Sequence, residues 1–178
     1  MHNTKLSKFI TEDDIQKRVS EIGKLLTDQF KNSKDPLIAI CVLKGSFMFY
    51  SDLTRHIDLD LSCEFLGVSS YHGASKSSGE VKMTLDLSTP IEGKNIILIE
   101  DIVDTGLTMN YLLKNLESRK PKKIVTVTLL HKPDASVIPC KIDHIGFKIE
   151  NDFVVGYGLD YQGYYRNLPY IAQVQNIN

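Results

Sequence analysis

Apolar positions near the start of the chain follow the period of a helix. Five of them recur at steps of three or four residues: Ile15, Val19, Ile22, Leu26 and Phe30. Just before them, Thr11 is followed by three acidic residues, and carboxylates are favourable at the positive end of a helix dipole. The pattern predicts an amphipathic helix that begins after Thr11 and ends near residue 32, ahead of an Asp-Pro turn.

Further along, apolar residues form short continuous runs, which are typical of strands covered on both faces. Such runs occupy residues 37–43, 95–99 and 123–130. Helix-like spacing lies between them, over residues 47–56 and over a segment that begins at Thr105-Gly106 and ends near residue 120. Strands that alternate with helices indicate a parallel sheet with right-handed crossovers.

Weaker strand patterns occur at residues 61–68, 80–87, 142–149, 153–155 and 171–174. Residues 69–79 are rich in serine and glycine and are predicted to form a loop. The chain contains no internal repeat and no linker-like segment. We therefore expect residues 1–178 to form a single domain.

Composition narrows the class of protein. Hydrophobic residues make up 42% of the chain, and 21 basic against 22 acidic residues give a net charge of -1. This balance does not favour binding to nucleic acid or to a membrane surface. No apolar run is long enough for a membrane span, and the N-terminus lacks a secretory signal. Widely spaced Cys41, Cys63 and Cys140 are typical of free thiols, so a cytoplasmic location is expected.

The residues with the clearest chemistry lie in segment 96–108. Four aliphatic residues lead directly into Glu100, Asp101 and Asp104, and a turn of small residues then opens a helix. Ligands of open α/β sheets bind beyond the carboxyl ends of the strands, and the N–H groups of a helix N-terminus favour a phosphate. The acids would repel a phosphate, so sugar hydroxyls or hydrated Mg²⁺ are their natural partners. The alternative is that these acids only cap the helix and solvate a loop.

Segment 96–108 resembles the phosphoribosyl-pyrophosphate motif of the type I phosphoribosyltransferases. Other segments resemble the hypoxanthine-guanine branch of this family, in the family's order: the pyrophosphate loop (43–46), the start of the flexible catalytic loop (70–71), the purine-binding lysine segment (131–133) and the base-stacking and metal-binding tail (153–161 and 165–169). The resemblance implies an α/β fold with a central, mainly parallel twisted sheet flanked by helices. It also implies a small hood formed by residues 1–12 and 150–178.

The activity that this resemblance implies is transfer of a phosphoribosyl group to hypoxanthine or guanine. The donor is 5-phosphoribosyl 1-pyrophosphate, and the products are IMP or GMP and pyrophosphate, formed through an oxocarbenium-like state. Asp104 would be the general base. The donor would be held by Glu100, Asp101, Thr105, Gly106, Leu107 and Thr108.

The remaining roles follow from the same resemblance. Pyrophosphate would be bound by Lys44, Gly45 and Arg166, and the flexible loop would close through Ser70 and Tyr71. Purine binding would use Lys132 as donor to the 6-oxo group, Phe153 as stacking platform and the Val154 backbone. Mg²⁺ is the implied cofactor, held by Glu100, Asp101 and Asp160. The family resemblance also implies a homodimer or homotetramer. Leu107 departs from relatives that carry lysine or asparagine there, which leaves donor affinity open.

Three other readings compete with this one. A regulator that binds the same donor and acts on nucleic acid would use the basic run at 119–123, although a basic helix C-terminus also accounts for that run. Dinucleotide-binding and Walker-type enzymes lack support, because neither glycine fingerprint is present. A transferase acting on adenine or a pyrimidine is disfavoured only through the resemblance at Lys132, Phe153 and Val154.

Overall fold

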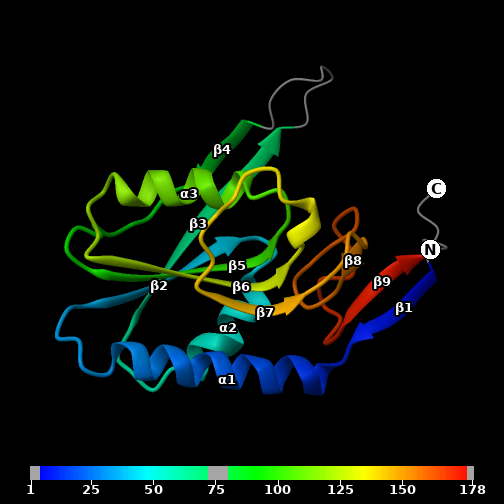
Figure 1. Cartoon of the computed structure of the whole chain (residues 1–178), viewed down its shortest axis with the longest axis horizontal. Coiled ribbons are helices and arrows are strands. Elements are labelled where there is room, and N and C mark those ends of the chain that lie inside the picture. Colours follow the sequence, from blue (N-terminus) through cyan, green and yellow to red (C-terminus); the bar gives the residue numbers. More distant parts are fainter. Residues whose placement is uncertain (1–4, 72–79, 176–178) are drawn as a thin grey trace.

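The computed structural model describes residues 5–71 and 80–175, with only the backbone of residues 70, 71 and 80. Figure 1 shows a large twisted sheet between helices, with a small sheet beside it. The helices are α1 (Glu12–Phe30), α2 (Phe47–Arg55), α3 (Leu107–Glu117) and a short 3-10 helix (Pro133–Ala135). The strands are β1 (Lys5–Ile10), β2 (Leu37–Leu43), β3 (Ser62–Tyr71), β4 (Glu80–Leu85), β5 (Asn95–Val103), β6 (Lys123–His131), β7 (His144–Lys148), β8 (Val154–Val155) and β9 (Ile171–Gln175). None of the described helices is long and apolar enough to cross a membrane.

The large sheet has the order β4-β3-β2-β5-β6-β7 within the described residues. Its strands run parallel from β3 to β7, and only β4 is antiparallel to its neighbour β3. The prediction of a mainly parallel α/β sheet is therefore confirmed. Because parallel strands end at the same edge, the segments that follow β2, β5 and β6 come together there.

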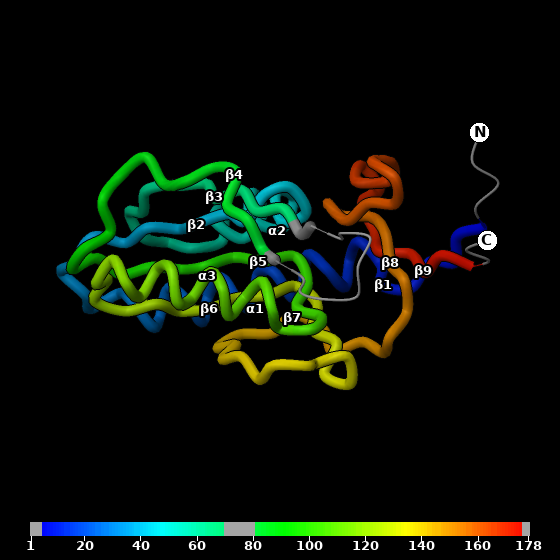
Figure 2. The backbone as a smooth tube through the Cα atoms, turned by 90° about the horizontal axis from the view of Figure 1, so that it is seen from above, coloured from blue at the N-terminus to red at the C-terminus, as the bar shows by residue number. Residues whose placement is uncertain are grey.

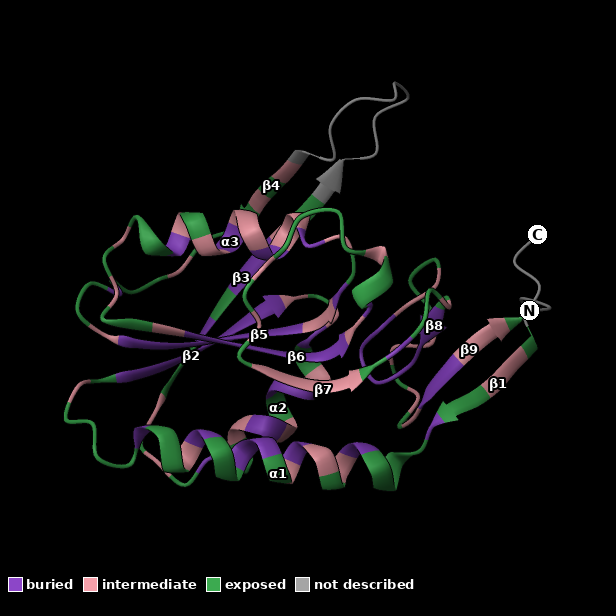
Figure 3. Cartoon of the chain, in the orientation of Figure 1, coloured by how far each residue is buried: buried purple, intermediate pink, exposed green. Residues whose placement is uncertain are grey.

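Helices cover both faces of this sheet. Alternate residues of β2 and β5 belong to two separate cores. Ala39, Cys41 and Ile97 pack on the side of α1 and α2, whereas Ile38 and Ile96 pack on the side of α3. This alternation is the period of two expected of strands, and it explains why these strands read as continuous apolar runs. Figure 3 shows the buried strands between helices whose outer faces are exposed.

The small sheet joins the two ends of the chain in the order β1-β9-β8. It lies beside the large sheet in Figure 1 and corresponds to the expected hood. β1 was not predicted as a strand, because its residues are mostly exposed and its alternation is weak. It is stabilised instead by antiparallel pairing with β9, from Lys5 opposite Gln175 to Ile10 opposite Ile171.

β5 is longer than the sequence pattern indicates. The apolar run ends at Ile99, but the strand continues to Val103, so Glu100 and Asp101 lie inside it. The backbone ladder to β6 continues through this part, with Glu100 opposite Thr128. Two carboxylates are therefore held by a rigid strand, and only Asp104 of the three acids stands in the turn beyond it.

Candidate active site

A hollow of about 310 Å³ lies at the carboxyl end of β5 and the start of α3. It is lined by Glu100, Asp101, Ile102, Val103, Asp104, Thr105, Gly106, Thr108 and Met109. These residues include the whole predicted donor-binding set except Leu107, which is the first residue of α3 and is partly buried. The place is the one where ligands of open α/β sheets bind.

The turn into α3 has a shape that requires glycine. Gly106 has a φ of 83°, in the left-handed region, and a Cβ there would lie 2.3 Å from the Ile138 carbonyl oxygen. The Thr105 carbonyl accepts hydrogen bonds from the N–H groups of Val137 (3.0 Å) and Ile138 (3.1 Å). The segment after β6 thus supports the turn through these backbone contacts. This support was not predicted, because Val137 and Ile138 carry no motif.

Glu100 is a buried acid with an unpaired atom. The residue is 8% exposed, and its Oε2 atom has no hydrogen-bond partner among the described residues. Burial raises the pKa of Glu100 well above its ordinary value, and the neighbouring Asp101 raises it further. A buried polar atom without a partner is costly, so this site favours a ligand that supplies hydroxyl donors or a cation.

Asp101 links three parts of the site. Its Oδ1 accepts a hydrogen bond of 2.9 Å from the Ile102 N–H. Burial raises the pKa of Asp101 to about 6, while the nearby charges of Arg166 and Asp160 act in opposite directions. On its other side, a Cβ built at Gly45 would lie 1.5 Å from Asp101 Oδ2, so only glycine fits there. The acid of β5 therefore lies against the predicted pyrophosphate loop and within the electrostatic reach of the hood.

Replacing Asp101 with asparagine is expected to stabilise the ligand-free protein at neutral pH. Because the pKa is raised from 3.8 to about 6, the folded state keeps a proton that the unfolded state releases in this interval. The stability from this proton is complete below the lower value and is lost as the pH rises through the upper one. Asp101→Asn should therefore raise the free energy of unfolding by about 2–3 kcal/mol at about pH 7, measured by urea denaturation.

The same comparison at low pH is its control. Below about pH 4 the wild-type carboxyl is protonated in both states, so the two proteins should have equal stability. A difference of the same size at both pH values would show that the charge of Asp101 is not its cause.

Lys44 and Gly45 lie between β2 and α2, next to Asp101. Lys44 is exposed, and the Leu43–Lys44 peptide bond is cis. The buried Ser46 donates a hydrogen bond of 2.5 Å to the Val42 carbonyl. This bond fixes the loop to the end of its strand. The predicted pyrophosphate loop therefore lies beside the hollow, at the point where Gly45 contacts Asp101.

Lys132 and Asp104 come together at the ends of β6 and β5. Lys132 Nζ lies 3.9 Å from Asp104 Oδ2. The lysine is 9% exposed, whereas Asp104 is exposed. The Lys132 N–H also donates to the Val103 carbonyl at 2.9 Å, which fixes the two turns relative to each other. A buried lysine beside an accessible carboxylate that lines the hollow provides a donor and a proton acceptor next to each other.

The hood presents an aromatic face and a charged pair. Phe153 is 41% exposed and makes an edge-to-face contact with Tyr161, with ring centroids 5.5 Å apart. Val154 is buried and pairs with Gln173 in the small sheet. Arg166 Nη2 lies 2.5 Å from Asp160 Oδ1. Figure 2 shows this part of the chain beside the end of the large sheet.

The predicted flexible loop is only partly described. The backbone of Ser70 and Tyr71 belongs to β3 and is paired with β4. Their side chains, and residues 72–79, lie outside the described residues.

The basic run proposed for a nucleic-acid regulator is largely engaged within the protein. Arg119 Nη1 lies 2.7 Å from Asp86 Oδ1, and Lys122 pairs with Asp35. The Lys123 ammonium lies over the Phe30 ring at 5.4 Å. Cations already partnered in this way are poorly placed to bind phosphates, so the structure does not favour the regulator.

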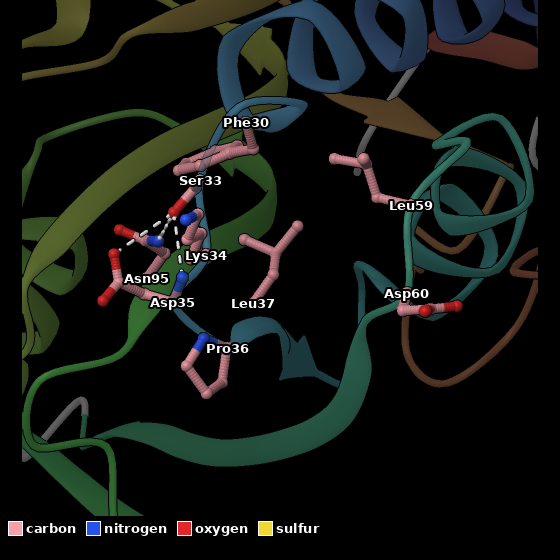
Figure 4. Close-up of a pocket in the computed structure, with 9 residues that line it drawn as sticks. All are labelled: Phe30, Ser33, Lys34, Asp35, Pro36, Leu37, Leu59, Asp60 and Asn95. Atoms are coloured by element: carbon pink, nitrogen blue, oxygen red, sulfur yellow. Dashed lines mark hydrogen bonds between the residues drawn. The ribbon is translucent and has the colours of Figure 1, made fainter.

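A second hollow, of about 370 Å³, lies at the opposite edge of the sheet. Figure 4 shows Phe30, Leu37 and Leu59 around it, with Ser33 hydrogen-bonded to Asp35 and Asn95. It adjoins the amino ends of β2 and β5, away from the edge where α/β folds bind their ligands. The first hollow is therefore the candidate active site.

Comparison with known proteins shows the family to which the chain belongs. The model of the phosphoribosyl transferase domain family matches residues 13–162. The hypoxanthine-guanine phosphoribosyltransferase of Bacillus subtilis (strain 168) is 49% identical over 164 residues, which cover 92% of this chain and 90% of the relative. That of Staphylococcus aureus (strain Mu50 / ATCC 700699) is 45% identical over 175 residues, covering 98% and 97%.

A solved structure shows the same likeness. The crystal structure of a hypoxanthine phosphoribosyltransferase from Staphylococcus aureus matches with a TM-score of 0.89 at 45% identity, covering 95% of this chain and 91% of that one. The resemblance seen in the sequence motifs is thus confirmed over nearly the whole chain. The chain belongs to the phosphoribosyl transferase domain family, in the branch of the hypoxanthine-guanine phosphoribosyltransferases.

Proposed function

We propose that the protein transfers a phosphoribosyl group from 5-phosphoribosyl 1-pyrophosphate to hypoxanthine, guanine or both, in purine salvage. One observation carries the proposal: Asp104 lines the hollow together with the donor motif, and Lys132 Nζ lies 3.9 Å from its carboxylate. A donor for an exocyclic oxygen and an acceptor for a ring proton are the two groups that a 6-oxopurine requires. Donor binding and base recognition would thus meet at one point.

The proposed roles give the phosphoribosyl donor one direction in the hollow. The 5′-phosphate would lie in the turn of Thr105 to Thr108, where the first N–H groups of α3 have no partners within the helix. Leu107 contributes its backbone N–H there. Glu100 and Asp101 would accept hydrogen bonds from the ribose hydroxyls, which would relieve the unpaired Glu100 Oε2. The pyrophosphate would then point to Lys44, Gly45 and Arg166.

In the reaction, the purine N9 attacks C1 of the ribose as the bond from C1 to the pyrophosphate oxygen breaks. Asp104 would take the ring proton, because its carboxylate is exposed and lines the hollow. Lys132 would donate to the 6-oxo group. Adenine carries an amino group at this position, so it would leave the buried ammonium facing a donor.

Glu100 and Asp101 have the chemistry to hold Mg²⁺, since they are adjacent oxygen donors and one oxygen is unpaired. The described residues contain no cluster of three or more His, Cys, Asp or Glu arranged as a metal site, so substrate and water oxygens would complete the coordination. Asp160 is a further candidate, although its carboxylate already binds Arg166 and the Gly163 N–H. When bound, Mg²⁺ would neutralise the charge of the leaving pyrophosphate.

The other parts of the proposal rest on the family resemblance. Phe153 would stack on the base, the Val154 backbone would meet its edge, and Ser70 and Tyr71 would close over the site to exclude water. The enzyme would work in the cytoplasm as a homodimer or homotetramer. Residues 1–178 would act as one domain, with the hood contributing the base platform.

A spectrophotometric assay tests the function directly. Purified protein, Mg²⁺ and 5-phosphoribosyl 1-pyrophosphate are mixed separately with hypoxanthine, guanine, xanthine, adenine and uracil. We expect turnover of hypoxanthine or guanine and none of adenine or uracil. Turnover of adenine alone would contradict the role given to Lys132. Donor binding without turnover of any base would favour the regulator instead.

A further inference from the structure

A partly buried hydrogen-bond cluster connects the hood to the body of the protein. At its centre is Asp52 on α2, whose Oδ2 accepts a hydrogen bond of 2.6 Å from the Tyr157 hydroxyl of the hood. The same oxygen accepts one of 2.9 Å from Gln16 Nε2 on α1. Arg55 lies 3.5 Å from the other oxygen of the carboxylate. None of these residues lines the candidate active site.

Tyr157 holds an unusual place in the chain. It is 4% exposed and has a φ of 47°, between Gly156 and Gly158, which also have positive φ values. Its N–H donates to the Leu168 carbonyl at 2.8 Å. A tyrosine in the left-handed region costs conformational energy, so its side-chain contacts must compensate. The hydroxyl bond to Asp52 is the polar part of that compensation.

The next residue, Gly158, lies directly on the pyrophosphate loop. A Cβ built on Gly158 would be 2.0 Å from the Gly45 carbonyl oxygen and 3.8 Å from Met48 Cβ. Gly45 precedes α2, and Asp52 is part of α2. Two successive hood residues therefore contact α2 or the loop before it. Gly158 contacts the loop at Gly45, and Tyr157 contacts the helix at Asp52.

From Gly158 the contacts continue to the charged pair of the hood. The Gly158 carbonyl accepts a hydrogen bond of 2.6 Å from Arg166 Nη1, and the Gly158 N–H donates to the Arg166 carbonyl at 2.9 Å. Arg166 then binds Asp160. Both charges are near enough to Asp101 to influence its pKa. A series of short contacts thus connects Tyr157 with the two charged groups near Asp101.

We propose that Asp52 and Tyr157 are positioning residues, whose hydrogen bond holds the turn of residues 156–160 against Gly45 and so sets Arg166 and Asp160 relative to the pyrophosphate loop. The effect on kinetics rests on the proposed function, but the effect on the hood does not. Losing the bond would loosen the turn and lower the fraction of protein in which both halves of the pyrophosphate site are in place.

The test is Tyr157→Phe, which removes the hydroxyl and keeps the ring. Hydrogen exchange at the N–H groups of residues 157 and 158 should become about tenfold faster, as expected for loss of one partly buried hydrogen bond. The KM for 5-phosphoribosyl 1-pyrophosphate should rise about fivefold, with kcat changed less than about twofold.

Tyr50→Phe is the matched control. Tyr50 is also a buried tyrosine, and it belongs to α2 itself. Its hydroxyl donates a hydrogen bond of 3.2 Å to the Ala39 carbonyl of β2, away from the hood. It should lower thermal stability without changing exchange in the hood or the KM for the donor. At Asp52, asparagine keeps a carbonyl acceptor for Tyr157 and Gln16, so Asp52→Asn should stay near wild type, while Asp52→Ala should behave like Tyr157→Phe.

Each outcome has a clear meaning. Unchanged exchange at residues 157 and 158 in Tyr157→Phe would overturn the proposal, as would an equal rise of KM in Tyr50→Phe. If the wild-type protein turns over no base, the proposed function fails, and the exchange measurement still decides whether Asp52 and Tyr157 hold the hood.

Discussion

Asp104→Asn is expected to lower kcat by about a thousandfold, while the dissociation constant of 5-phosphoribosyl 1-pyrophosphate stays within about threefold of wild type. Asparagine has nearly the size of aspartate, but it cannot take the purine proton. Asp104 lies in the turn beyond β5, and only its side chain is required for proton transfer. In the proposed site the donor would be held by the neighbouring strand residues and by the backbone of the turn, which this change leaves in place.

The measurement separates chemistry from binding. Steady-state kinetics with hypoxanthine gives kcat, and isothermal calorimetry with the donor and Mg²⁺ gives its affinity. Asp134→Asn is the matched control, because it removes an exposed carboxylate from the 3-10 helix that follows Lys132. It should leave kcat near the wild-type value. Full turnover by Asp104→Asn would exclude Asp104 as the general base.

Most of the large sheet could be predicted from the sequence, because its cause is local. The run at 37–43 becomes β2 with the same limits, since every position from Leu37 to Val42 is buried. The stripe that begins at Ile15 becomes α1, and Thr11 caps it by accepting a hydrogen bond of 3.2 Å from the Asp14 N–H. These patterns need only the period of the element and the chemistry of its ends.

What was missed depends on contacts between distant parts of the chain. β1 exists because β9 pairs with it from the other end of the sequence. β5 continues through two acids because β6 supplies the ladder beside it. The hydrogen bond between Asp52 and Tyr157 could not be predicted, because aspartate is common on surfaces and tyrosine in cores, and neither residue belongs to a pattern that pairs them. The motif at 100–108 could be recognised because one strand and one turn carry nearly all of it.

Lys132 shows how a local sequence motif and a contact between distant parts of the chain combine. As one of many lysines it would be read as a surface residue, and only its place after β6 and its motif single it out. The structure shows it buried, with its Nζ 3.9 Å from Asp104 Oδ2. Burying an ammonium is costly, so a partner beyond the single contact to Asp104 is favoured, and a 6-oxo group of a base would provide one.

Lys132→Met is therefore expected to raise the KM for hypoxanthine about a hundredfold, which is the loss of one charge-assisted hydrogen bond in a buried site. Methionine keeps the length and much of the apolar stem, so the fold of the turn should persist. Affinity for 5-phosphoribosyl 1-pyrophosphate should remain within about threefold, since Lys132 is not among the residues that line the proposed donor site.

Lys148→Met provides the comparison for this substitution. Lys148 ends β7, the strand next to β6, and it is exposed, so its loss removes the same charge without touching the rim of the hollow. Its KM for hypoxanthine should equal that of wild type. Adenine adds a second comparison. The ammonium proposed to reject adenine is absent from Lys132→Met, so the ratio of kcat/KM for hypoxanthine to that for adenine should fall. An unchanged KM for hypoxanthine in Lys132→Met would show that another donor binds the 6-oxo group. The base would then have to lie in a different orientation from the one proposed, in which its 6-oxo group points to Lys132.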